Sequence, residues 1–559
     1  MKTAGQLLVE CLENEGVKYV FGIPGEENLE LIEALDRSDQ IQFVVTRHEQ
    51  GAAFMAEIYG RLTGHAGVCL ATLGPGATNL VTGVADAYLD GSPVVAITGQ
   101  VNSEQMHLTS HQLIDLTKIF ESITLRTKMV IRPDTVNEIC RQVFKYAEGA
   151  GGRRGAAHMG IPVDVAKMEV SDEEHPLRRQ EFRAVEPKSE NIRKAAELIN
   201  ASKRPLILIG NYTTYGHDLD VITRFATMLR IPAVSTMMAK GVVPCDNPYA
   251  MMTIGIPGRD YVNLLFDQAD LVICIGYDIT ELNPAKWNGA RNHRIIQIDN
   301  LPADVNKYYQ CDIEVRGNNG HALEEILKYT EPREEPEWAF QIRRMYRDSI
   351  ADVCRDDSFP MKPQRILHDI RTALKNRDDI LISDVGAHKV WIGRQYECYE
   401  PNTSIISNGF ASMGIGVPGA VAAKLVYPDR NVLAVTGDGG FMMNSQELET
   451  AVRLGLNFVV VIFEDSHYGL IQWKEEAQYG REACVDFTNP DFVLLAQAMH
   501  CKGVRINSPD ELIPAIENGF LESVPVIIDL PVDYSENMKL TEALQNLPQP
   551  GSCQSSHGK

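Results

Sequence analysis

Short runs of apolar, mostly β-branched residues recur along this chain and alternate with stretches of helical periodicity. The clearest runs are PLILI at 205–209, LVICI at 271–275, GLNFVVVIF at 455–463 and VIIDL at 526–530. Runs that are apolar along their whole length are typical of strands buried on both faces of a parallel sheet. Because parallel strands are joined by crossover helices, the alternation predicts an α/β fold of doubly wound domains with mainly parallel sheets.

The chain has 559 residues, too many for one hydrophobic core, so three domains are expected. Polar, proline-containing stretches near 168–187 and 330–337 interrupt the alternation and are interpreted as linkers. We therefore predict a first domain at 1–172, a central domain at 188–332, a third domain at 360–540 and a tail at 541–559. A strand at 294–299 is expected to close the central series.

Composition excludes several classes of partner. The net charge of −22 argues against binding to nucleic acid or to an anionic membrane, although it leaves an anionic small substrate possible. The 11 cysteines include no CxxC pair, as expected in a reducing cytoplasm. Acidic residues occupy the N-terminal stretch where a signal peptide needs an apolar core, and no apolar run reaches about 18 residues. A cytoplasmic protein is expected.

Two strand ends in the third domain each carry an acidic residue. VTGDGG at 435–440 places Asp438 in a glycine-rich turn, and FEDSHY at 463–468 supplies Asp465. Carboxylate oxygens suit a hard divalent cation, and glycines leave backbone N–H groups free to face a phosphate. The alternative is an ordinary strand–turn with a capping aspartate.

Three features of the first domain are also candidates. Glu49 follows the expected strand 41–46, where a partly buried carboxylate could exchange a proton with a heterocyclic nitrogen, or could simply favour a helix N-terminus. The turn from Gly74 to Asn79 is rigid, but a plain β–α connection has the same pattern. His111 and Gln112 lie in a polar segment that is most simply a surface loop.

Two further turns of the third domain follow expected strands. NGFASMGIG at 408–416 carries Met413 among small residues, where it could support a ring or only fill the core. Val385, Gly386 and His388 follow the strand 380–383, so that the histidine could meet a phosphate.

Taken in order, the motifs RHE, LGPGATN, VGAH, NGFASMG, GDGGF and EDSHYG resemble those of thiamine-diphosphate enzymes of the acetolactate synthase/pyruvate decarboxylase superfamily. The resemblance extends to about Asp533. It implies that Asp438, Asp465 and the carbonyl of His467 hold Mg²⁺ against the diphosphate, with Asp465 standing where asparagine is usual. It also implies that Glu49 bonds the pyrimidine ring of the cofactor and activates it.

The same resemblance assigns the remaining contacts of the cofactor. Met413 would wedge it in a bent conformation, and the carbonyl of Ala411 would accept a hydrogen bond from its amino group. The active site would lie between the first domain of one subunit and the third domain of another, which implies a homodimer at minimum and favours a homotetramer. The residues expected around the cofactor are Pro24, Gly25, Gly74, Asn79, Val385, Gly386, His388, Ala411, Met413, Gly437, Gly439, Gly440, Tyr468, Gly469, Leu470 and Ile471.

Within the superfamily the chain is most similar to the flavin-free catabolic acetolactate synthases. GYDITELNPAKWN at 276–288 and the His111–Gln112 pair resemble that type, whereas the flavin-containing type has an arginine-bearing segment at the first place. This implies thiamine diphosphate and Mg²⁺ as cofactors, no catalytic FAD, and small 2-oxoacids as substrates. The catabolic pattern has a lysine where this chain has Leu125, which is a departure.

The expected reaction is decarboxylation of pyruvate and ligation of the remaining two-carbon unit to a second pyruvate, giving 2-acetolactate. Gln112 and His111 would orient the acceptor, while Leu470 and Ile471 would form an apolar wall. The chain lacks the His-His dipeptide of simple pyruvate decarboxylases, which favours ligation over protonation. The alternatives are a 2-oxoacid decarboxylase, a carboligase with another acceptor, or a catalytically silent subunit that binds the cofactor.

Overall fold

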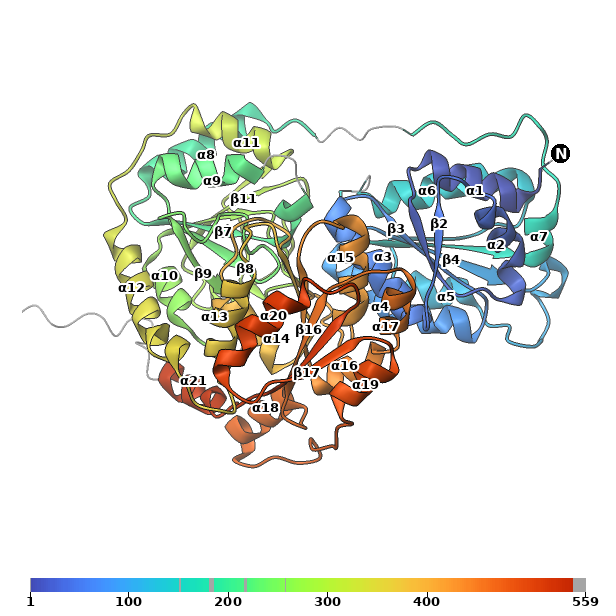
Figure 1. Cartoon of the computed structure of the whole chain (residues 1–559). Coiled ribbons are helices and arrows are strands. Elements are labelled where there is room, and N and C mark those ends of the chain that lie inside the picture. Colours follow the sequence, from blue (N-terminus) through green and yellow to red (C-terminus); the bar gives the residue numbers. More distant parts are fainter. Residues whose placement is uncertain (1, 150–151, 180–184, 216–218, 257, 546–559) are drawn as a thin grey trace, which may run out of the picture.

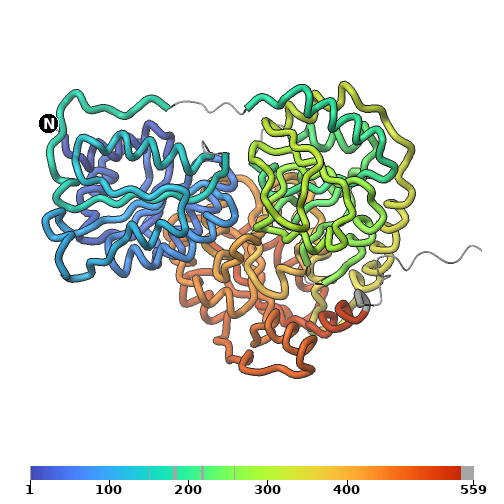
Figure 2. Tube along the Cα trace, turned by 180° about the vertical axis from the view of Figure 1, so that it is seen from behind, coloured from blue at the N-terminus to red at the C-terminus, as the bar shows by residue number. Residues whose placement is uncertain are grey.

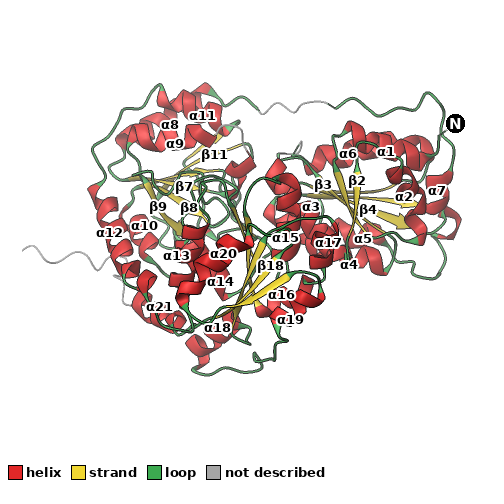
Figure 3. Cartoon of the chain, in the orientation of Figure 1, coloured by secondary structure: helices red, strands yellow, loops and turns green. Residues whose placement is uncertain are grey.

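The computed structural model describes residues 2–149, 152–179, 185–215, 219–256 and 258–545. Its strands form three separate six-stranded sheets, and each sheet lies within one of the three predicted domain ranges. Helices cover the sheets (Figure 3), and every strand pair within them is parallel. The predicted class, α/β with parallel sheets, is confirmed.

The first domain (blue in Figure 1) has the strand order β2-β1-β3-β4-β6-β5. Its helices begin and end at recognisable signals: a Thr3–Gln6 capping box opens α1, and Pro75 opens α4, which ends at Gly91 in the left-handed conformation. The strands are β1 (Tyr19–Gly22), β2 (Gln42–Val45), β3 (Gly67–Ala71), β4 (Val94–Gln100), β5 (Arg126–Met129) and β6 (Ala156–Pro162). The helices are α1 (Ala4–Asn14), α2 (Leu29–Asp36), α3 (Glu49–Thr63), α4 (Pro75–Asp90), α5 (Leu116–Glu121), α6 (Val136–Ala147) and α7 (Val163–Lys167).

The central domain has the strand order β9-β8-β7-β10-β11-β12, the doubly wound order in which the chain reverses direction between β7 and β10. The strands are β7 (Pro205–Ile209), β8 (Ala233–Thr236), β9 (Ala250–Ile254), β10 (Leu271–Ile275), β11 (Arg294–Asp299) and β12 (Ile313–Arg316). The helices are α8 (Ser189–Ala201), α9 (Leu219–Leu229), α10 (Tyr261–Gln268), α11 (Asn319–Leu327) and α12 (Glu337–Ala351).

The third domain has the order β14-β13-β15-β16-β18-β17, which repeats that of the first domain strand for strand. The strands are β13 (Ile380–Ser383), β14 (Ser404–Ile406), β15 (Val432–Gly437), β16 (Val459–Glu464), β17 (Lys502–Arg505) and β18 (Val526–Pro531). The helices are α13 (Pro363–Ala373), α14 (Ala387–Gln395), α15 (Gly416–Val426), α16 (Asp438–Asn444), α17 (Glu447–Arg453), α18 (Gly469–Tyr479), α19 (Phe492–Ala498), α20 (Leu512–Gly519) and α21 (Glu536–Gln545).

The first and third domains share a hydrophobic core through α3 and α15. Small residues allow this approach, since a Cβ added at Gly419 of α15 would lie 3.3 Å from a side-chain carbon of Ile58 in α3. Seen from behind, the third domain lies against both other domains (Figure 2), and helix α14 contacts β9 of the central domain. The third domain is therefore held against its own first domain by packed helices.

The structure corrects the expectations at several points. The strand 294–299 was expected to close the central series, but β12 follows it at the edge of the sheet. Helix α21 continues to Gln545, so the first residues of the predicted tail are helical, and 546–559 lie outside the described residues. Among the described helices, none is long and apolar enough to cross a membrane.

Candidate active site

A cavity of about 190 Å³ lies at the carboxyl edge of the third sheet. Loops that follow β13, β15 and β16 converge on it, together with the turn between β14 and α15. In open parallel sheets this edge is where ligands bind, at the point where the strand order reverses. The lining residues are Val385, Gly386, Ala387, His388, Ala411, Met413, Gly437, Asp438, Gly439, Gly440, Phe463, Asp465, His467, Tyr468, Gly469, Leu470, Ile471 and Tyr534. Every third-domain residue predicted for the cofactor or metal is among them.

Asp438 is fixed in place by a set of N–H donors. Its side chain is 1% exposed and accepts hydrogen bonds from the backbone N–H groups of Gly439 at 2.8 Å and Ser466 at 2.7 Å. The Asn489 amide donates to the same carboxylate at 2.8 Å. These donors join the loop after β15 to the loop after β16, so the two acidic strand ends lie next to each other.

Asp465 has a buried carboxylate oxygen that a bound cation could pair with. Its Oδ1 accepts from the backbone N–H of His467 at 3.2 Å, but its Oδ2 is buried and has no hydrogen-bond partner among the residues that the structure describes. Burial and the neighbouring charge of Asp438 raise the pKa of Asp465 to about 7. Two carboxylates this close, one with a buried unpaired oxygen, form a donor set that fits a hard divalent cation.

Another part of the cavity lining, around His388, is suited to bind an anion. His388 is buried, and burial lowers its pKa to about 3, so the ring is neutral near pH 7. Within the described part of the chain its Nε2 has no hydrogen-bond partner, and the ring lies 3.4 Å from the place that a Cβ at Gly437 would occupy. A buried nitrogen without a partner, beside a turn of bare backbone, is suited to meet a phosphate oxygen.

The turn between β14 and α15 brings Ala411 and Met413 to the cavity. Ala411 adopts a positive φ of 63°, which is costly for a residue with a Cβ. Just beyond it, Asp384 accepts hydrogen bonds from the backbone of Gly414 at 2.9 Å and of Gly416 at 2.9 Å. Asp384 therefore joins this turn to the end of β13.

The predicted first-domain residues form a second group. Glu49 is the first residue of α3 and is 8% exposed, and the Asn79 amide donates to its Oε2 at 2.9 Å. A Cβ added at Gly76 would lie 3.2 Å from the Glu49 carboxylate. The turn also contacts Gln112, since a Cβ at Gly74 would lie 2.8 Å from the Gln112 carbonyl oxygen. The structure thus brings Glu49 and Gln112 to the same turn.

The remaining first-domain predictions lie at the surface of this group. Pro24 is exposed in the loop after β1, and a Cβ at Gly25 would collide with Thr72 at 2.5 Å. His111 is exposed beside Gln112, which has a positive φ of 56°. None of these first-domain residues lines the third-domain cavity, all of whose walls come from residues 385–534.

The sequence reasoning missed several residues of the site. Ala387, Phe463 and Tyr534 also line the cavity, and Asp384 connects its loops. Glu447 of α17 was missed as well, although its carboxylate accepts from the backbone N–H of His48 at 3.0 Å, directly before Glu49. An acidic residue at a strand end was a signal for Asp384, whereas Glu447 lies within a helix and gave none.

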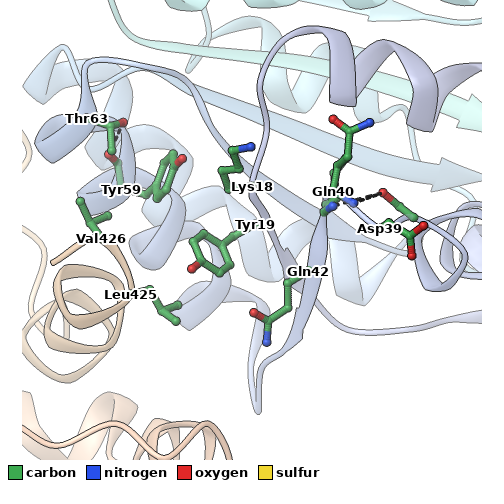
Figure 4. A pocket seen from close by; sticks show the side chains of 11 residues that line it. Lys18, Tyr19, Asp39, Gln40, Gln42, Tyr59, Thr63, Leu425 and Val426 are labelled. Carbon is green, nitrogen blue, oxygen red and sulfur yellow. Dashed lines mark hydrogen bonds between the residues drawn. The ribbon is translucent and has the colours of Figure 1, made fainter. Parts of the chain in front are cut away.

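A larger cavity of about 650 Å³ lies at the free edge of the first sheet (Figure 4). Tyr19, Gln42 and Tyr59 line it together with Leu425 and Val426 at the end of α15. It lies beside the edge strand β2 and brings together no pair of carboxylates. Size alone therefore does not identify the site, and the convergence of strand ends on the smaller cavity is the stronger indication.

Comparison with known protein families agrees with this assignment. Models of the N-terminal, central and C-terminal domains of thiamine pyrophosphate enzymes match residues 2–119, 192–326 and 384–530. The chain therefore belongs to the thiamine pyrophosphate enzyme family.

Among curated proteins, the chain is similar to several acetolactate synthases over nearly its whole length. A probable acetolactate synthase large subunit of Methanocaldococcus jannaschii is 35% identical over 98% of this chain and 95% of its own length. The acetolactate synthase of Bacillus subtilis is 34% identical over 96% of this chain and 94% of its own. A catabolic acetolactate synthase of Raoultella terrigena is 33% identical over 95% of both.

Proposed function

We propose that this protein is an acetolactate synthase that joins two molecules of pyruvate into 2-acetolactate with loss of CO₂. The observation that carries the proposal is the third-domain cavity. There an unpaired carboxylate oxygen of Asp465 and an unpaired nitrogen of His388 lie at the same edge of the sheet. Cation and anion preferences side by side fit a metal-bound diphosphate. Near-full-length similarity to acetolactate synthases selects the reaction.

Asp438 and Asp465 would hold Mg²⁺, together with the carbonyl of His467, while the glycine turn 437–440 meets the diphosphate. Bound thiamine diphosphate would supply a thiazolium carbon that attacks the carbonyl of pyruvate once its proton is removed, and a thiazolium ring that accepts the electron pair released by decarboxylation. Asp438 is suited to this task because its N–H donors hold it rigidly before any ion arrives.

Glu49 is the residue that would exchange a proton with the pyrimidine ring. It is nearly buried, and the Asn79 amide fixes one of its two oxygens, leaving the other free to face a nitrogen. Met413 would support the bent cofactor, and the carbonyl of Ala411 would accept from its amino group. Gln112 and His111 would orient the acceptor, with Leu470 and Ile471 as the apolar wall.

The complete site requires a second copy of the chain. The third-domain cavity is about 190 Å³, smaller than the roughly 300–1,000 Å³ of typical ligand pockets, and no first-domain residue lines it. Large apolar side chains around the nearby turns remain exposed in the single chain, namely Phe410, Met442, Met443, Tyr468 and Ile471. A partner's first domain, bringing its Glu49, would cover them. A homodimer is the minimum, and the sequence resemblance favours a homotetramer.

We also propose that catalysis needs no flavin. In the central domain a dinucleotide would lie where the strand order reverses, between the ends of β7 and β10. There a Cβ at Gly210 would collide with the carbonyl oxygen of Gly276, and the N–H of Tyr212 donates to that oxygen at 3.1 Å. The backbones of the two loops are in contact at this point, and this contact supports the proposal.

The test is a product assay with purified protein, thiamine diphosphate, Mg²⁺ and pyruvate, with and without added 2-oxobutyrate. We expect 2-acetolactate and CO₂ from pyruvate alone, at full rate in a colourless preparation. Acetaldehyde without acetolactate would instead identify a decarboxylase, and a requirement for FAD would overturn the flavin-free assignment. Cofactor binding without release of CO₂ would identify a silent subunit.

A further inference from the structure

Three carboxyl groups of the first domain are buried together where that domain meets the other two. Glu57 of α3 and Asp86 and Asp90 of α4 are each at most 1% exposed, and one oxygen of each lies within 4.8 Å of the others. Arg61, one turn after Glu57, donates to the carbonyls of Ile406 in the third domain and Met238 in the central domain. Buried acids are costly unless they are neutralised or hydrogen-bonded, so this arrangement calls for a role.

Two of these acids grip a loop of the third domain. Asp90 Oδ1 accepts from the backbone N–H of Gly409 at 2.6 Å, and a Cβ at Gly409 would lie 2.7 Å from that oxygen. Asp86 Oδ1 accepts from the backbone N–H of Ser412 at 3.2 Å and from the Ser407 hydroxyl at 3.1 Å. Loop 407–412 is therefore attached at both its ends and its middle to helix α4.

The grip is centred on Ala411, which lines the proposed cofactor cavity. Its N–H donates to the Ser407 hydroxyl oxygen at 3.2 Å, and that hydroxyl donates in turn to Asp86. The next N–H along the chain, that of Ser412, reaches Asp86 directly. Asp86 is thus connected to the N–H of Ala411 through Ser407 and to the N–H of Ser412 directly. The positive φ of 63° at Ala411 is unfavourable and must be imposed by its surroundings.

We propose that Asp86 and Asp90 are positioning residues that fix loop 407–412, and through it Ala411, at the cofactor cavity of their own chain. A subunit's first domain then has two tasks. It offers Glu49 to one active site, and it holds the cofactor-contacting loop of another. The link to catalysis rests on the proposed function, whereas the attachment of the loop does not.

The role depends on hydrogen-bond acceptance rather than on full charge. Three carboxyl groups this close cannot all be ionised, and burial raises the pKa of Glu57 well above its usual range and that of Asp86 to about 7. An asparagine at position 86 keeps the oxygen that accepts from Ser407 and Ser412, and its amide can donate to Glu57. Asp86→Asn should therefore preserve what Asp86→Ala destroys.

Amide hydrogen exchange of the cofactor-free protein, followed by mass spectrometry, tests the attachment. Asp86→Ala and the smaller change Ser407→Ala should each raise exchange in loop 407–412 at least tenfold, while Asp86→Asn stays within about threefold of the parent. Ser404→Ala is the matched control. Ser404 is also buried, in the strand β14 that precedes the loop, but its hydroxyl has no hydrogen-bond partner among the described residues. Ser407→Ala keeps the test decisive if Asp86→Ala does not fold.

Calorimetric titration with thiamine diphosphate and Mg²⁺, and steady-state rates with pyruvate, test the link to catalysis. Ser407→Ala should bind the cofactor about tenfold more weakly and lower kcat with KM for pyruvate within twofold, and Ser404→Ala should change neither. Unchanged loop exchange in Ser407→Ala would overturn the inference and leave the proposed function standing. A parent protein that binds no cofactor would overturn the proposed function, while the exchange data would still decide the attachment.

Discussion

The first and third domains have the same strand order, yet the strand ends at the reversal point differ completely. In the first domain the loops after β1 and β3 close on each other, since the Thr72 hydroxyl donates to Glu27 at 2.7 Å across the gap. In the third domain the equivalent loops, after β13 and β15, both line the cavity, with His388 after β13 and Asp438 after β15. The same fold supplies a closed edge in one place and an open edge in the other.

The difference shows that topology offers a place for a ligand but loop sequence decides whether it is used. The first-domain residue proposed to exchange a proton, Glu49, lies instead at the end of the neighbouring strand β2, where it begins α3. The two domains also support each other within one chain. Asp86 and Asp90 hold the third domain's loop 407–412, and Glu447 of the third domain holds the backbone that precedes Glu49.

The largest effect is expected from removing the carboxylate that the first domain contributes to the proposed active site. Glu49→Gln should bind cofactor normally but lose about 100-fold or more in turnover, because general acid–base residues contribute on that order. The measurements are kcat and the rate at which the thiazolium C2 proton of the bound cofactor exchanges with deuterium. Glu190→Gln is the control, since Glu190 also lies in the first turn of a helix and pairs only with Lys194 at the surface. Undiminished turnover in Glu49→Gln would mean that Glu49 is only a helix-end residue.

The next largest effect is expected from removing a proposed metal ligand of the third domain. Asp438→Ala should weaken binding of thiamine diphosphate with Mg²⁺ by at least about 100-fold, because even outer partners of metal ligands cost 10- to 100-fold. Asp465→Asn is the matched variant: it keeps an oxygen ligand and should stay within about tenfold of the parent. Calorimetric titration measures both. Equal, small effects in the two variants would show that the acidic pair does not hold the metal.

The smallest effect is expected for Glu447, whose carboxylate holds the backbone that precedes Glu49. Burial raises its pKa from 4.5 to about 6, so the folded protein binds this proton more tightly than the unfolded chain does. The stability that follows is present below pH 4.5 and is lost as pH rises through about 6, an effect of about 2 kcal/mol. Glu447→Gln has no such proton, so its thermal midpoint should gain about 1–3 °C on the parent's between pH 4.5 and 7.

The control for this prediction is Glu324→Gln, since Glu324 is exposed in α11 of the central domain and pairs with Arg224 at the surface. It should follow the parent at every pH. Because a chain of three domains does not unfold in one step, the comparison is made between variants at the same pH, not as an absolute free energy. A pH-independent difference between Glu447→Gln and the parent would contradict the assigned pKa.

Most of the buried strands were predictable from the sequence because they are largely apolar. The bounds of β7, β10, β11 and β13 agree with the predicted runs residue for residue. Of the strands that were not predicted, β5, β9, β12 and β17 lie at sheet edges, where one side is free and polar residues are tolerated. The interior strand β6 was missed for another reason: it is fully buried but built from small residues, with Gly160 and His158 inside it.

Local sequence determined the third-domain cavity because its residues lie at the carboxyl ends of strands or in the segments that follow them, and parallel strands carry such residues to one edge. It likewise determined the family, through motifs such as GDGG and EDSHYG. Only the tertiary structure decided what surrounds them. Asp86 and Asp90 lie inside an ordinary amphipathic helix, more than 300 positions from the loop they bind. Their role comes from the packing of α3 against α15, and contacts between distant segments leave no periodic or local pattern in a single sequence.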